Sequence, residues 1–330
     1  MLGVSCNSLC SDNYGCTVYA DWLFFKVSGD ELDVLSVSQG VSNTPNEPRV
    51  TVDNWSRIDV CPNYDSGYRV GLIKDMRCAS IFGEWTSYST DKRTSFHFDG
   101  PSSSSEPFAF TSDFINTNTT AHKSFDFESD FRFSYNRLDV GSKKKIINTC
   151  DFSLSPTVAF TYLHTREDLS ADATSFFVDP EPGNTSQINT FDGKTKYDGF
   201  GATVGCNCLW QFIKCFALYV DASASLTYGC NDVQYSFNRF NDQFVPFDNT
   251  YNFSYDKWKS LYINTFKIGL RSETEICNQY HVYGMIGWEY VVFYDQTNWM
   301  VKQTMNFPES FKPSGNLYLQ GLVLRGGINF

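Results

Sequence analysis

Residues 214–229 show an uninterrupted two-residue alternation that is long enough to cross a membrane. Apolar side chains occupy the even positions, and small or polar ones fill most of the odd positions. Side chains of a β-strand point to opposite faces in turn, so this segment predicts a strand with one apolar and one water-compatible face. A transmembrane β-barrel needs that pattern, with lipid on one side and the lumen on the other. The even positions are Phe216, Leu218, Val220, Ala222, Ala224, Leu226 and Tyr228.

The end of the chain, residues 316–330, carries the same alternation and finishes on Phe330. Leu322, Leu324 and Ile328 share the apolar face, and Arg325 lies on the other. At the edge of a soluble sheet such a strand invites aggregation, because its backbone groups have no partner. In a barrel it closes the ring by pairing with the first strand, which we predict at residues 16–27.

Composition supports a single large sheet of this kind. Aromatic residues make up 17% of the chain and charged residues only 19%, below the ~25% usual for soluble domains. No run of ~18 apolar residues is present, which excludes a transmembrane helix. Composition alone leaves a large soluble β-sandwich or solenoid open as the alternative.

The connections between the predicted strands alternate in length, as in outer-membrane barrels, where periplasmic turns are short and outer loops long. A soluble sandwich has no reason to sort its loops in this way. We identify eleven strands, but single-chain bacterial barrels have an even number, so we predict an all-β antiparallel barrel of about twelve strands, with roughly 10 to 16 open. Residues 1–15 are predicted as a flexible segment, and residues 16–330 as one barrel domain. Short connections are predicted at 28–30, 74–76, 141–149, 209–213 and 273–278, and long ones at 39–65, 89–122, 165–196, 230–258 and 295–315.

Charged side chains are absent from the apolar positions of these strands, so we predict that they line the lumen. Arg or Lys facing lipid at mid-depth would cost about 2–4 kcal/mol each. Mixed signs predict a water-filled path with weak ion selectivity, and the alternative is a narrow barrel closed by internal ion pairs. The predicted pore-lining residues are Asp21, Arg69, Glu84, Arg132, Asp221, Lys267, Arg271, His281, Glu289 and Arg325.

Six of the eleven cysteines fall at or near the short connections, which predicts a disulfide belt at the periplasmic rim, within the barrel or to neighbouring proteins. The alternative is that small residues at strand ends are simply often Cys. The odd total leaves at least one thiol free or paired with another molecule. Cysteine spacing does not fit a zinc site. The six candidates are Cys78, Cys150, Cys206, Cys208, Cys215 and Cys277.

The sequence shows no catalytic constellation. The four histidines, His97, His122, His164 and His281, are far apart and have no recognised spacing. We therefore expect no enzyme, no cofactor and no bound metal. A net charge of −11 and a pI near 4.8 argue against nucleic acid as a partner.

Several segments, in order along most of the chain, resemble the major outer membrane porin family of chlamydiae and legionellae. The resemblance implies a channel-forming barrel that is rich in disulfides in its chlamydial branch, to which the cysteine content leans. It carries over no individual pore residue. The segments include T-V-Y-A-D-W-L-F-F-K-V at 17–27, Y-D-G-F-G-A-T-V-G at 197–205, Y-V-D-A-S-A-S-L-T-Y-G at 219–229 and L-Q-G-L-V-L-R-G-G-I-N-F at 319–330.

These observations together predict a protein of the bacterial outer membrane that acts as a passive porin for small hydrophilic solutes and ions. The alternative is a structural or adhesive, disulfide-linked surface barrel with a closed lumen. The expected partners are outer-membrane lipid, the solutes and disulfide-linked envelope proteins, and a homotrimer is open. No signal peptide is visible before Cys6, so we expect that one was removed.

Overall fold

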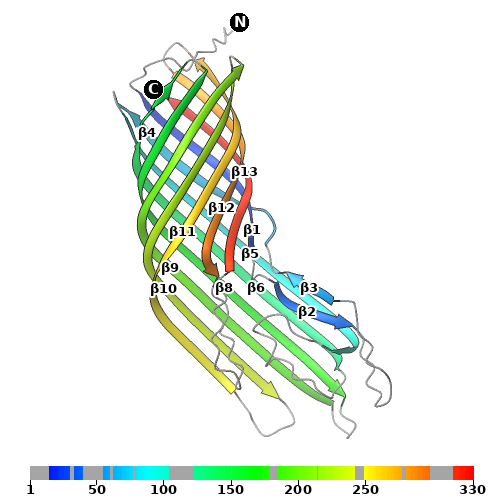
Figure 1. Ribbon diagram of the computed structural model, residues 1–330. Helices are drawn as coiled ribbons and strands as arrows, with labels where there is room; N and C mark the ends of the chain where they lie inside the picture. The colour runs from blue at the N-terminus through cyan, green and yellow to red at the C-terminus, as the bar shows by residue number, and fades with distance from the viewer. Residues whose placement is uncertain are drawn as a thin grey trace.

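The computed structural model describes residues 15–29, 33–39, 55–59, 62–76, 79–103, 122–149, 151–178, 184–213, 215–241, 249–276, 280–297 and 315–330. Within these ranges, ten antiparallel strands form a closed ring (Figure 1). No helix in the described ranges is long and apolar enough to cross a membrane. In ring order the strands are β1 (Cys16–Gly29), β4 (Asp65–Asp75), β5 (Ser80–Ser103), β6 (His122–Lys143), β8 (Phe152–Val178), β9 (Asn184–Ile213), β10 (Phe216–Asn241), β11 (Asn249–Ile276), β12 (Tyr280–Thr297) and β13 (Gly315–Asn329).

In the described part of the chain, three short strands lie outside the ring. β2 (Asp33–Gln39) and β3 (Trp55–Asp59) form a hairpin that pairs with the far end of β5, and β7 (Ile147–Asn148) pairs with β8. The closed antiparallel barrel is confirmed, but ten strands replace the predicted twelve. One of the eleven strands that the sequence predicts lies at residues 31–38 and corresponds to β2. This strand has 7 residues, fewer than the 9–11 or so that a tilted strand needs to cross.

The ring closes between the first and last strands, as predicted. Thr17 pairs with Asn329 and Gly29 with Leu317, and the register between them is unbroken. Beyond the ladder, the Cys16 amide donates to the Phe330 carbonyl at 2.8 Å, and the Phe330 amide donates to the Cys16 carbonyl at 3.0 Å. The sheet therefore has no free edge at this seam, which removes the aggregation hazard of the apolar closing strand.

The stagger of the strands fixes the width of the barrel. Register partners followed from Leu23 through β4, β5, β6, β8 and β9 reach Asn231 of β10, whereas the path through β13, β12 and β11 reaches Tyr219. The two paths differ by 12 residues along β10 (231 minus 219). With strands about 4.8 Å apart and a rise of about 3.3 Å per residue, the tilt is about 40° and the backbone radius about 10 Å. Such a barrel has room inside for little more than its own side chains.

The outer face of the barrel carries an apolar band between two groups of exposed aromatic rings. On β10 the band runs from Phe216 to Tyr228, which spans about 30 Å at this tilt and matches the hydrocarbon core of a bilayer. Aromatic girdles at both interfaces are typical of outer-membrane barrels. At the short-turn end the rings are Trp210, Phe212, Phe216, Tyr280 and Phe330, and at the other end Tyr64, Phe200, Tyr228, Trp258, Tyr262 and Tyr294.

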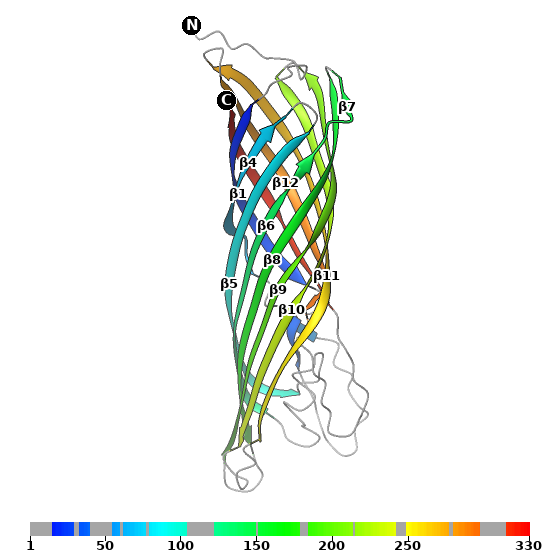
Figure 2. The ribbon, with the colours of Figure 1, turned by 90° about the vertical axis from the view of Figure 1, so that its left-hand side faces the viewer.

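Six neighbouring strands, β5, β6, β8, β9, β10 and β11, continue well past the second girdle, whereas β1, β4, β12 and β13 stop near it (Figure 2). Much of what the sequence predicted as long loops is therefore strand, because hairpins such as β8–β9 remain paired as far as Val178 and Asn184. The short connections of such barrels face the periplasm, so the extended sheet projects from the outer surface. The end of β1 at Cys16 and the C-terminal Phe330 lie at the periplasmic end (Figure 1).

Candidate functional site: the barrel interior

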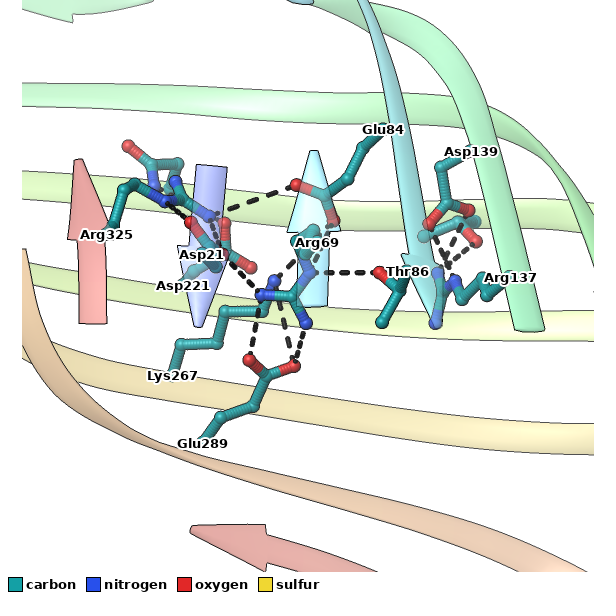
Figure 3. Close-up of polar contacts among 12 residues, drawn as sticks. Asp21, Arg69, Glu84, Thr86, Arg137, Asp139, Asp221, Lys267, Glu289 and Arg325 are labelled. Carbon is teal, nitrogen blue, oxygen red and sulfur yellow. Dashed lines mark hydrogen bonds and ion pairs between the residues drawn. The ribbon is translucent and has the colours of Figure 1, made fainter. Parts of the chain in front are cut away.

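The inner wall is built from alternate residues of the ten strands, and its periplasmic half is charged. We call Asp21, Arg69, Glu84, Lys267, Glu289 and Arg325 the charged zone (Figure 3). Each lies on the strand face opposite the lipid-facing side chains. The tilt and stagger of the ring bring these six residues from β1, β4, β5, β11, β12 and β13 to neighbouring heights in the lumen.

Arg69 is the centre of the charged zone and is only 3% exposed. Its guanidinium binds Glu289 at both ends, with Nη2 to Oε1 at 2.7 Å and Nη1 to Oε2 at 2.9 Å. Nη1 also donates to Asp21 at 3.0 Å, and Nε donates to Thr86 at 3.0 Å and lies 3.3 Å from Glu84. A buried guanidinium whose three nitrogens all donate hydrogen bonds is held in one position, because moving away from any carboxylate would leave a buried charge unpaired.

Arg325 extends the network from the closing strand. Its guanidinium forms a two-point contact with Asp21, at 2.6 and 2.8 Å, and stacks on the Tyr19 ring with 4.2 Å to the centroid. Lys267 of β11 lies 3.8 Å from Glu289 on the neighbouring strand and 3.8 Å from Glu84 on the opposite wall, too far for direct hydrogen bonds.

A second ion pair lies on the facing wall. Arg137 binds Asp139 on its own strand, with Nε to Oδ2 at 2.6 Å, and reaches Thr203 and Ser225 at 3.1 and 3.0 Å. Thr161 also donates to Asp139, at 2.6 Å. Small hydroxyl side chains thus line this wall and leave space between it and the charged zone.

That space is a cavity of about 160 Å³ in the periplasmic half of the lumen. It is lined by side chains from both ion-pair systems and by Tyr19, Asn207, Tyr219 and Asp221. The interior polar groups therefore face a void of molecular size and do not fill the barrel completely.

The outer half of the lumen is filled differently, by an apolar zone in which no side chain is more than 2% exposed. Fully buried apolar side chains pack here from many strands at once. We define the apolar zone as Leu23, Phe25, Val27, Tyr88, Leu163, Leu261, Ile263, Val291, Phe293, Leu317 and Leu319.

The apolar zone spans the whole lumen. Phe293 of β12 meets Tyr135 of β6 in an edge-on ring contact with centroids 5.4 Å apart, and it meets Phe133 at 6.5 Å. β6 and β12 are separated by four strands in each direction around the ring, so they lie on opposite walls. Their rings meet across the middle of the barrel, and the described conformation is closed at this level.

Nine of the ten residues predicted to line the pore have side chains on the inner face. Eight of them are in the charged zone or line the cavity beside it, including Arg271 and Asp221. Asp221 contacts Asn207 at 3.3 Å and Tyr219 at 3.1 Å. Nearer the short turns, Arg271 stacks on Tyr283 at 4.1 Å and binds Glu273 at 2.9 Å, and His281 Nδ1 lies 3.8 Å from Glu273.

The prediction for Arg132 is wrong, because its side chain is exposed on the outer face and binds Asp130 at 3.1 Å. In the sequence the apolar residues of this strand change parity, from Phe131 and Phe133 to Leu138 and Val140. That change predicts a bulge after Asn136, with Phe131 and Phe133 toward lipid. The register of β6 with both neighbours is instead unbroken there. This part of β6 lies above the membrane, where water surrounds the barrel and apolar side chains fill its interior. Here the apolar residues therefore face inward and the polar residues face outward, the opposite of the arrangement within the membrane.

Sequence reasoning also missed Arg137 and Asp139 as inner residues, and Lys143 farther along the same strand. If the two-residue alternation is continued in both directions from the lipid-facing Leu138 and Val140, all three residues fall on the inner face. The predicted bulge breaks this alternation next to Arg137, which is why sequence reasoning missed them.

The structure describes three of the six cysteines that the sequence predicts in a periplasmic belt. Cys215, at the turn between β9 and β10, is disulfide-bonded. Cys206 and Cys208 are free and stand on the lipid-facing side within β9, so they form no part of a rim belt. Cys78, Cys150 and Cys277 lie outside the described residues. Among those that are described, no group of three His, Cys, Asp or Glu could hold a metal ion.

Two of the histidines, which the sequence suggested were isolated, form pairs with aspartates. His164 Nδ1 lies 2.7 Å from Asp198, and His97 contacts Asp126. Both pairs face outward on the extended sheet. Cys230 lies in the same register, but Asp198 separates it from His164. The His164 imidazole is therefore not next to the Cys230 thiol, as it would have to be to activate that thiol as a nucleophile.

The sequence from residue 15 to residue 330 matches the family model described as Legionella pneumophila major outer membrane protein precursor. The chain belongs to this family. Together with the closed ring and its lipid-facing band, this makes the protein an outer-membrane β-barrel, as the resemblance implied. No curated protein sequence matches the chain.

Similar solved structures are also outer-membrane barrels. They include the protease OmpT from Escherichia coli, with 10% identity, a TM-score of 0.39 and coverage of 100% of this chain and 98% of that one. The toluene transporter TodX from Pseudomonas putida has 8% identity, a TM-score of 0.27 and coverage of 100% and 96%. A Pseudomonas aeruginosa FadL homologue has 7% identity, a TM-score of 0.28 and coverage of 98% and 91%.

One of these neighbours corrects an expectation from the sequence. We expected no enzyme, and this is corrected to a narrower statement: a protease is among the similar barrels, so the absence of an activity is not a finding for this chain. A TM-score of 0.39 assigns no proteolytic activity to this family member.

Proposed function

We propose that this protein is an outer-membrane channel for small hydrophilic solutes and ions, closed toward the outer surface in the conformation described. The observation that supports the proposal is the polar cavity in the periplasmic half of the lumen, walled by Arg69, Glu289 and Arg137 among others. Charged and hydroxyl side chains at that depth are typical of a path for hydrated solutes.

The contrast between the two halves of the lumen strengthens the argument. The barrel fills its outer half with apolar side chains such as Phe25 and Phe293, both 0% exposed. The same solution was available for the inner half, where buried charges stabilise less than well-packed apolar residues of similar volume. Keeping charges there is expected when the lumen must hold water or a solute.

The apolar zone then serves as the gate. Hydrophobic constrictions close channels because water and ions leave an apolar passage. Phe293 of the apolar zone meets Tyr135 from the opposite wall, with ring centroids 5.4 Å apart. Passage requires these rings to separate.

The second candidate is the structural or surface barrel with a sealed lumen, and the apolar zone is the observation that favours it. Side chains such as Phe25, Leu261 and Leu317 are buried as completely as those of a soluble core. In this case the charged zone stabilises the barrel and nothing crosses.

Planar bilayer recordings on the refolded full chain separate the two functions. The channel predicts stepwise conductance for the wild type and larger steps for Phe25→Ala, which thins the apolar zone. Phe24→Ala is the matched control, because Phe24 is 40% exposed on the lipid side and its removal leaves the lumen unchanged. If the folded wild type is silent and only Phe25→Ala conducts, the sealed barrel is the better description.

A further inference from the structure

We propose that the lumen holds a binding site for a small, doubly charged oxyanion at its periplasmic end, between Lys143, Arg271 and Arg325. The proposal goes beyond channel function, since a barrel sealed at its apolar zone would still bind an anion from the periplasmic side. The argument begins from the charges around the cavity.

Cationic side chains outnumber carboxylates on the cavity wall. Six cations line it, and the carboxylates that do so are Glu84, Asp139, Asp221 and Glu289. Asp21 and Glu273 also contact arginines but do not line the cavity. With these two carboxylates counted, cations and carboxylates are equal in number. The excess of positive charge therefore concerns only the side chains that face the cavity.

The location follows from which cation keeps an unsatisfied donor. Arg69 and Arg137 each form short hydrogen bonds with a carboxylate, at 2.7 and 2.6 Å, and Arg325 forms two with Asp21, at 2.6 and 2.8 Å. At the periplasmic end, Arg271 binds Glu273 through Nη2, but its buried Nε has no hydrogen-bond partner. A buried donor without an acceptor costs about 1–3 kcal/mol, so this N–H is set to receive one.

Lys143 supplies the second feature of the site. It is the last residue of β6 and lines the cavity together with Arg271 and Arg325. The charges with the largest effect on it include those of Arg271, Arg325 and Lys145, and one carboxylate, Asp75, opposes them. The Asp75 carboxylate also accepts a hydrogen bond from Ser80.

An oxyanion with two negative charges fits this setting. It would accept charge-assisted hydrogen bonds from the Lys143 ammonium and the Arg271 Nε–H, and it would offset the repulsion among the neighbouring cations. A cavity of about 160 Å³ admits a group the size of phosphate. The site lies inside the barrel wall and away from lipid, so a free anion is the occupant that it favours.

Isothermal titration of the refolded full chain in detergent with inorganic phosphate, at constant ionic strength, tests the site. We expect saturable phosphate binding that chloride does not reproduce. Lys143→Gln should weaken the affinity about tenfold, since it removes one charge-assisted hydrogen bond. Lys143→Arg keeps the charge and should retain binding, which separates loss of the charge from misfolding.

Lys144→Gln is the matched control, because Lys144 is the next residue and is exposed. It should bind phosphate like the wild type. Absence of saturable binding in the folded wild type would overturn the proposal, and so would equal weakening by Lys143→Gln and Lys144→Gln, which would indicate nonspecific charge attraction. Because titration measures binding and not current, a failure here leaves the channel proposal untouched, and silent bilayers leave this one untouched.

Discussion

Arg69 and Glu289 are 220 residues apart in the chain and form a two-point ion pair inside the barrel, at 2.7 and 2.9 Å. Three steps around the ring separate their strands, β4 and β12. The pair joins walls that share no backbone hydrogen bonds with each other, so it stabilises the closed shape of the barrel as well as its charge balance.

Arg69→Met should therefore destabilise the protein by about 3–5 kcal/mol, because it leaves Glu289 and Asp21 buried with fewer partners. Urea unfolding in lipid vesicles, followed by tryptophan fluorescence, measures the loss. Arg132→Met is the control, since the exposed Arg132–Asp130 pair should contribute less than about 1 kcal/mol.

The double variant Arg69→Met/Glu289→Met removes both charges of the pair. Its loss should be smaller than the sum of the two single losses, because the residues are in contact and their effects are coupled. Additive losses would mean that the two side chains do not interact in the membrane-embedded protein.

The closing strand allows a test of membrane depth. Leu324 pairs with Trp22 and Ile286, both exposed to lipid, near the middle of the apolar band. Leu324→Lys should cost about 2–4 kcal/mol in the same unfolding experiment, and Gln320→Lys, nearer the outer girdle, about 0–1 kcal/mol. Equal costs at the two positions would contradict the placement of the band.

The alternation of the membrane-spanning strands could be predicted from the sequence because lipid imposes it. A strand that faces hydrocarbon on one side must be apolar at every second residue, and β10, β12 and β13 obey that rule across the bilayer. For the same reason the inner position of residues such as Asp21 and Arg325 followed from parity alone.

The extended strands were missed for a related reason. Above the membrane both faces of a strand such as β9 can be polar, and Ser, Asn and Asp there look like loop residues. The sequence also predicts β2 as a strand of the barrel, although it lies outside the ring. Alternation shows that a segment is a strand but not which strand it pairs with.

The ion pairs could not be predicted at all. That Arg69 meets Glu289, and that Phe293 meets Tyr135, depends on the 12-residue stagger and on the number of strands. Neither quantity is present in any single segment of the sequence.

Asp172 gives the extended sheet a pH dependence. Burial raises the pKa of its carboxyl, and the charges of Asp192 and Glu128 beside it raise it further. A carboxyl whose pKa is higher in the folded state binds its proton more tightly there. Stability therefore falls as the pH rises from the ordinary carboxyl pKa, about 3.9, through the raised value.

Asp172→Asn should accordingly increase the protection of this part of β8 at neutral pH. Hydrogen exchange of the backbone amides around residue 172, measured at several pH values, reads the effect locally. The difference from the wild type should vanish below about pH 3.9, where the carboxyl is protonated in both states. A difference that persists there would assign the effect to something other than charge.

The cysteines report which parts of the barrel water can reach. Cys206 and Cys208 are free and face lipid within the apolar band, whereas Cys230 is free and lies beyond Tyr228 of the outer girdle. The thiolate is the reactive form of cysteine, and hydrocarbon does not support its formation. A water-soluble maleimide should therefore modify Cys230 in protein refolded into vesicles and leave Cys206 and Cys208 unmodified.

Mass spectrometry of the digested protein identifies the modified positions. Unfolding in urea should expose Cys206 and Cys208, and Cys215 should react only after its disulfide is reduced. Cys230→Ser is the control that confirms the assignment of the first signal. If Cys206 and Cys208 react as fast as Cys230 in the folded protein, β9 does not cross the bilayer where its apolar residues place it.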